Sequence, residues 1–84
     1  MANVCILTVN NTESALYLDG KFIDSAEKKL QDIKHYWMIN FGKRLAAAHD
    51  SELKQYRHEV NEETWNWIKL AAQLPHLSPV NTQS

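Results

Sequence analysis

The residues best suited to nucleophilic or metal chemistry are one cysteine, Cys5, and four histidines spread along the chain. Cys5 lies inside an apolar segment, and a nucleophilic thiol needs a lowered pKa and a nearby base. We therefore interpret it as a small buried hydrophobe. None of the histidines has the i, i+4 spacing that presents two metal ligands from one helical face, so no metal site is predicted. The histidines are His35, His49, His58 and His76.

Other catalytic patterns are equally weak in this sequence. Glu62 and Glu63 are adjacent acids, but their place in the first turn of a predicted helix explains them by the helix dipole. Gly20 and Gly42 are isolated, so the sequence contains no glycine-rich loop for phosphate. We therefore predict a non-enzymatic protein without a cofactor.

Basic residues gather in the middle of the chain. Between residues 28 and 57, seven lysines and arginines stand against three acids, a local excess of +4 in a chain of net charge −1. A helix pair with such an excess can contact nucleic-acid phosphates, so a nucleic-acid-binding regulator is our alternative hypothesis. Ion pairs on a solvated helix face, such as Lys28–Asp32, explain the same pattern. The nucleic-acid contacts would be Lys43, Arg44, Lys54 and Arg57.

Aromatic content favours a protein partner instead. Three tryptophans, three tyrosines and two phenylalanines give a large apolar area for 84 residues. Trp and Tyr side chains often dominate the binding energy of protein interfaces. We favour a protein–protein interaction module, a small inhibitor or regulator, with a second copy of the chain as one candidate partner. The candidate contact residues are Trp37, Tyr56, Arg57 and Trp67.

The run ALYLDGK at residues 15–21 is similar to the hairpin of many small bacterial and mobile-element proteins, which implies a turn. The small size and near-neutral charge also resemble those of phage- and plasmid-borne inhibitors, including anti-CRISPR proteins, at the level of class.

Length and composition indicate the number of domains and the cellular compartment. A chain of 84 residues with 44% hydrophobic residues is typical of one globular domain, which we place at residues 1–75. No apolar run is long enough for a transmembrane helix, and no basic leader precedes the apolar start. With one cysteine, the chain suits a reducing compartment, so we expect a cytoplasmic protein without a membrane partner.

The first third of the chain predicts strands. Residues 4–9 are apolar on both sides, and residues 15–18 form a second apolar run. Asp19-Gly20 follows directly, and such a pair favours a tight hairpin turn with positive φ at both positions. We predict a three-stranded antiparallel meander over residues 3–24.

A long helix is predicted over residues 25–48. Asp24 and Glu27 have the spacing of a capping box at its start, and helix-forming residues on both sides of Gly42 favour continuation through that glycine. A stripe at three-to-four spacing is the predicted face toward the core. The stripe consists of Leu30, Ile33, Trp37, Phe41, Leu45 and Ala48, widened by Tyr36 and Ile39.

One or two shorter helices are predicted next. The polar segment 51–60 is followed by Asn61 as an N-cap, with Val60 and Trp65 spaced as a hydrophobic staple. Pro75 would end this helix, and residues 76–84 would form a flexible tail. The predicted fold class is α+β, a three-stranded meander followed by a long helix and one or two shorter helices.

Overall fold

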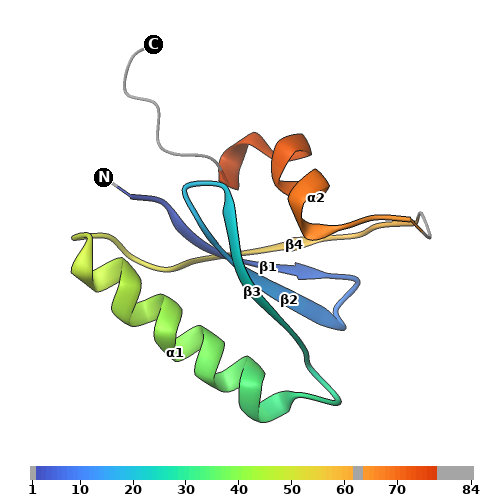
Figure 1. Ribbon diagram of the computed structural model, residues 1–84, viewed down its shortest axis with the longest axis horizontal. Coiled ribbons are helices and arrows are strands. Elements are labelled where there is room, and N and C mark those ends of the chain that lie inside the picture. Colours follow the sequence, from blue (N-terminus) through green and yellow to red (C-terminus); the bar gives the residue numbers. More distant parts are fainter. Residues whose placement is uncertain (1, 62–63, 78–84) are drawn as a thin grey trace.

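A four-stranded sheet with helical structure on each side is seen in the computed structural model, which describes residues 2–61 and 64–77 (Figure 1). The α+β class is confirmed, although the sheet is mixed and has four strands. The elements are β1 (Val4–Val9), β2 (Glu13–Leu18), β3 (Lys21–Glu27), α1 (Asp32–Ala48), β4 (Lys54–His58), α2 (Trp67–Gln73) and a 3-10 helix η1 (Pro75–Leu77).

Strands β1, β2 and β3 form the predicted antiparallel meander. The β2–β3 turn has positive φ at both Asp19 (53°) and Gly20 (81°), as the Asp-Gly pair predicts. The β1–β2 turn uses two asparagines in the same left-handed region, Asn10 and Asn11. Asparagine tolerates this conformation better than most residues with a Cβ, so both turns follow from local sequence.

Strand β4 lies within the polar segment 51–60, so of the one or two shorter helices predicted after residue 48, none forms in this segment. β4 pairs with β1 in parallel, with Leu7 beside Tyr56, and gives the sheet order β3-β2-β1-β4. β1 is buried on both faces, and its backbone groups on the side away from β2 need hydrogen-bond partners. β4 supplies them, and α1 is the helical crossover that a parallel connection requires.

Helix α1 begins later than predicted. Strand β3 extends to Glu27, and Asp24 pairs with Leu16 across the sheet, so the predicted capping box is wrong. The observed N-cap is Gln31, which makes no side-chain capping bond. The helix then runs through Gly42 to Ala48 without a break, as predicted.

Helix α2 is shorter than the predicted helix that starts after Asn61. Its N-cap is Asn66, whose Oδ1 accepts from the Lys69 N–H at 2.8 Å. The chain at Val60 is instead extended and is held by the side-chain amide of Asn10 at 2.8 and 3.0 Å, so the predicted staple of Val60 is wrong. The helix ends before Pro75, as predicted. Residues 62 and 63 lie outside the described residues.

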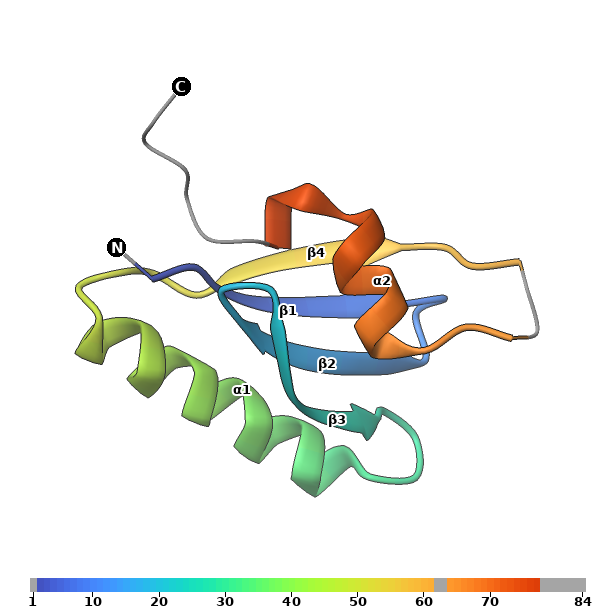
Figure 2. The same ribbon diagram turned by 45° about the horizontal axis from the view of Figure 1, so that its top comes forward.

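Helices lie on the two faces of the sheet (Figure 2), and an apolar cluster packs on each face. On one face, Met38 and Ala46 of α1 pack on a cluster of β1, β2 and β3 residues. On the other face, Leu70, Ala71 and Leu77 pack on the second cluster. The first cluster contains Val4, Ile6, Leu16 and Ala26, and the second contains Cys5, Leu7, Val9, Ala15 and Tyr17. Helices on both faces explain why β1 is apolar on both sides.

The predicted tail at residues 76–84 falls mostly outside the described residues. Leu77 is described, and its side chain is fully buried against the α2-side cluster. The packed part of the chain therefore reaches at least Leu77.

Candidate interaction surface on helix α1

Helix α1 faces the sheet with small residues. Its buried residues are Met38, Gly42 and Ala46, which are four positions apart and lie in one row along the helix. A Cβ added at Gly42 would lie 3.1 Å from Leu16 Cδ1 and 3.2 Å from Leu53 Cδ1. The helix backbone therefore approaches the sheet closely at Gly42, and a larger residue there would push it away.

Because this row faces the sheet, most of the predicted core stripe of α1 points outward, and that prediction is wrong. Of the stripe, Leu45 packs against the core, together with Ile39. The large residues on the other side of the helix are more than half exposed, namely Ile33 (70%), Tyr36 (67%), Trp37 (66%) and Phe41 (52%), as is Leu30 (80%) in the turn before the helix. We call these five residues the outer face of α1.

The outer face of α1 has a definite shape. Tyr36, Trp37 and Phe41 line a shallow hollow of about 540 Å³, together with the polar residues Asn40 and Arg44. An apolar patch rimmed by polar side chains is typical of a surface that binds another macromolecule. Helix α1 forms the outermost layer on its side of the sheet in Figure 2, so this patch is open to a partner.

The four predicted contact residues do not lie on one surface. Trp37 is on the outer face of α1, whereas Tyr56 and Trp67 pack against the α2-side cluster. Arg57 is exposed on β4. Trp65 meets Trp67 edge to face, with ring centroids 4.9 Å apart, so both indoles contribute to packing.

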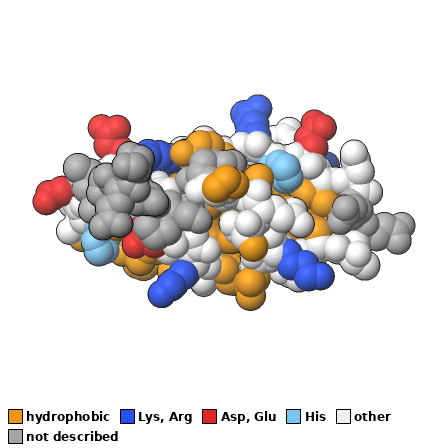
Figure 3. Space-filling view, turned by 90° about the horizontal axis from the view of Figure 1, so that it is seen from above, with side chains coloured by type: hydrophobic (Ala, Val, Ile, Leu, Met, Phe, Trp, Pro, Cys, Tyr) orange, Lys and Arg blue, Asp and Glu red, His pale blue; other side chains and the backbone are white. Residues whose placement is uncertain are grey.

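Trp67 also lines a second apolar hollow, on the α2 side of the molecule. This hollow has a volume of about 420 Å³ and lies between Phe22 on β3 and the exposed Ile68 on α2. On the face seen in Figure 3, hydrophobic side chains lie scattered between charged and neutral ones. The exposed aromatic side chains of α1 make the outer face the larger apolar surface.

The four basic residues of the nucleic-acid hypothesis also lie apart. Lys43 and Arg44 are on α1. Lys54 is the register partner of Cys5, whose side chain is on the α2 face, whereas Arg57 is the partner of Thr8, on the α1 face. Side chains three positions apart on a strand point to opposite faces. The geometry therefore offers these residues no common phosphate-binding surface.

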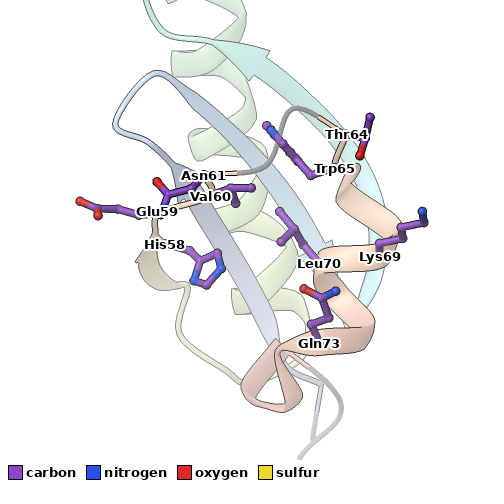
Figure 4. Close-up of a pocket in the computed structure, with 9 residues that line it drawn as sticks. All are labelled: His58, Glu59, Val60, Asn61, Thr64, Trp65, Lys69, Leu70 and Gln73. Carbon is purple, nitrogen blue, oxygen red and sulfur yellow. The ribbon is translucent and has the colours of Figure 1, made fainter.

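A third hollow, of about 220 Å³, lies between the end of β4 and α2 (Figure 4). In Figure 4 the side chains of His58, Leu70 and Gln73 point toward one another, while Glu59 and Lys69 point away. The walls are mixed, with uncharged and apolar groups facing the interior. This hollow has the size for one side chain or a small molecule, and of its described lining residues, the acid Glu59 and the base Lys69 do not point into it.

Cys5 is a buried thiol, as predicted. Its Sγ lies 3.2 Å from Asn3 Oδ1, to which it donates, and burial raises the pKa of the thiol to about 11. The thiolate is therefore scarce at neutral pH, and the residue acts as core packing with one hydrogen bond.

A serine–histidine contact, which the sequence gave no reason to expect, lies on the α1 face of the sheet. Ser14 Oγ is 2.9 Å from Thr8 Oγ1 and 3.2 Å from His35 Nε2. Such a pair can activate a nucleophile, but Ser14 has no exposed surface, so a substrate has no access to its oxygen. The three groups satisfy one another between α1 and the sheet.

In residues 2–61 and 64–77, no three histidine, cysteine or acidic side chains come together in a way that could hold a metal ion. Over the same residues, no helix combines the length and apolar character needed to cross a bilayer.

Comparison with protein-family models, with curated proteins and with solved structures finds no significant match. The function of the chain is therefore inferred from its surfaces.

Spacing assigns the large residues of the outer face to the core, Trp37 included, although the residue type of Trp37 also makes it a candidate partner contact. The signal that could have separated the two sides of α1 is the row Met38, Gly42, Ala46, since a glycine inside a helix often marks close packing.

Proposed function

We propose that this chain is a protein–protein interaction module that binds its partner through the outer face of α1, as a small inhibitor or regulator would. The observation that carries the proposal is the exposure of five large apolar side chains, four on one side of helix α1 and Leu30 in the turn before it. Leaving them in water costs hydrophobic free energy that a partner would recover.

The residue types support a protein partner over nucleic acid. Trp and Tyr with an adjacent arginine are the residues that most often carry interface energy, and Trp37, Tyr36 and Arg44 line the same hollow. Apolar anchors spaced along one helix face are also the pattern with which a helix docks into an apolar groove.

Photo-crosslinking tests this proposal. A benzophenone side chain would replace Trp37 on the outer face, and in a matched control it would replace the exposed Ala72 on α2. We expect covalent adducts with one protein, identified by mass spectrometry, at position 37 but not at position 72. Adding Phe41→Asp, which places a charge in the patch, should remove the adduct at 37.

The proposal is overturned by equal adducts at the two positions, or by none at position 37. A position-37 adduct that survives Phe41→Asp would also contradict it, because a specific apolar contact would not tolerate that charge.

A further inference from the structure

We infer that the partner of the outer face of α1 is a second copy of this chain, with the two α1 helices packed antiparallel about a twofold axis. This inference rests on the proposed function and names the partner for the same surface. It follows from three properties of the helix, namely its spacing, its charges and its exposed area.

The spacing of the outward residues of α1 is the same when read from either end. A twofold interface brings one patch onto itself, so the patch must be self-complementary. In an antiparallel pair centred between Met38 and Ile39, Tyr36 of each copy lies opposite Phe41 of the other, and Trp37 lies opposite Asn40. The outward positions are Ile33, Tyr36, Trp37, Asn40, Phe41 and Arg44, at i, i+3, i+4, i+7, i+8 and i+11.

The charges on one flank of this row select the antiparallel direction. Asp32 and Lys43 are both exposed and are eleven residues apart, about three helical turns, so they lie on the same flank. Within the part of the chain that the structure describes, neither forms an ion pair. In an antiparallel pair, Asp32 of each copy lies beside Lys43 of the other. A parallel pair would instead place this flank of each copy beside the opposite flank of the other, so Asp32 and Lys43 would not meet.

The opposite flank carries less free charge. Lys34 is paired within its own chain to Asp24, with Nζ 3.3 Å from Oδ1. The twofold pair therefore gains attraction on one flank and meets an already compensated charge on the other.

The exposed area is of the right order for a small dimer. Aromatic side chains offer about 150–250 Å² each, so Tyr36, Trp37 and Phe41, each more than half exposed, present on the order of 350 Å² per chain, and the exposed Ile33 and Leu30 add to this area. Specific interfaces bury about 800 Å² per partner. Asn40, Arg44 and the flanking charges lie around the patch and would supply the rest.

Sedimentation equilibrium of the full chain tests the inference. We expect a mass near twice that of the 9.7 kDa chain at high concentration, and a single-chain mass for Trp37→Asp. Asp32→Lys alone and Lys43→Asp alone should each weaken self-association about tenfold, because each change places like charges together at two symmetric sites. The double variant Asp32→Lys/Lys43→Asp should recover it. Glu52→Lys, a charge reversal away from the row, is the matched control.

The rescue separates an interface from an effect on folding. Both reversals alter the charge distribution of α1 within one chain, and their combination does not undo that change inside a monomer. Recovery by the double variant therefore requires contact between two copies, and its failure overturns the antiparallel pair.

A single-chain mass at every concentration overturns the inference. Adducts at position 37 with a different protein would then leave the proposed function standing. No adducts of any kind at that position would overturn both.

Discussion

The two sides of helix α1 carry opposite kinds of side chain. The side against the sheet has Met38, Gly42 and Ala46, and the side toward solvent has the large residues of the outer face, including Trp37. The fold therefore depends on a close approach of backbone to sheet, and the aromatic bulk of α1 takes no part in it. Apolar residues that a fold does not use are the ones available for binding.

The largest expected difference between the two sides is in stability. Leu16 is fully buried beneath α1, so Leu16→Ala removes packed atoms and leaves a cavity. We expect the free energy of unfolding to fall by about 2–5 kcal/mol. Trp37→Ala removes a side chain that is 66% exposed, and alanine favours the helix, so the change should stay within about 0.5 kcal/mol.

Urea unfolding measures both variants at low protein concentration, where self-association adds little to the measured stability. A loss for Trp37→Ala as large as that for Leu16→Ala would mean that the outer face belongs to the core after all.

A smaller effect is expected from filling the close contact. Gly42→Val places its Cβ at 3.1 Å and 3.2 Å from two leucine methyl carbons and adds two methyl groups beyond it. We expect a loss of about 1–3 kcal/mol from overpacking, in spite of the higher helix propensity of valine.

Ala47→Val is the matched control for Gly42→Val, because Ala47 lies in the same helix and is exposed. It should cost about 0.5 kcal/mol through helix propensity alone. Equal losses for the two variants in thermal unfolding would contradict the close approach of α1 to the sheet.

The sequence correctly predicts those features of the fold that depend on residues close together in the chain. The Asp19-Gly20 turn, the meander and the continuation of α1 through Gly42 depend on neighbouring residues, and all three are confirmed. β4 could not be predicted in this way, since its strand conformation comes from the free edge of β1, far away in the sequence. At Asp24 a helix start was predicted where the structure has a strand, because the spacing of a capping box can also occur within a strand.

The sequence predicts the candidate surface only in part, because tertiary packing also decides which side of α1 faces the sheet. Periodicity finds an apolar row on α1, but the helix carries two rows on opposite sides, and the row Met38, Gly42, Ala46 packs on the sheet. Spacing assigns Trp37, Tyr36 and Phe41 alike to the core, and only the residue type of Trp37 makes it a candidate partner contact as well. Which row faces the sheet depends on how closely the helix backbone approaches the sheet at Gly42. That distance is a property of the packed structure and cannot be read from periodicity.

The smallest expected effect concerns pH and again belongs to the side of α1 that faces the sheet. His35 is partly buried there, with Nε2 3.2 Å from Ser14 Oγ. Burial lowers the pKa of His35 below its ordinary 6.5, and the charge of Lys28 lowers it further. The unfolded chain then binds a proton at higher pH than the folded chain does, so acid favours unfolding.

The contribution of His35 to stability is therefore complete above pH 6.5 and is lost as the pH falls from there toward the lowered pKa of the folded state. Urea unfolding from about pH 8 to about pH 5 should show this loss in the parent chain and a shallower one in His35→Gln, which keeps a hydrogen-bonding group but does not titrate. The same slope in both chains would mean that His35 is as well solvated as the outward residues of α1. The difference in burial between the two sides of α1 would then not extend to the first turns of the helix.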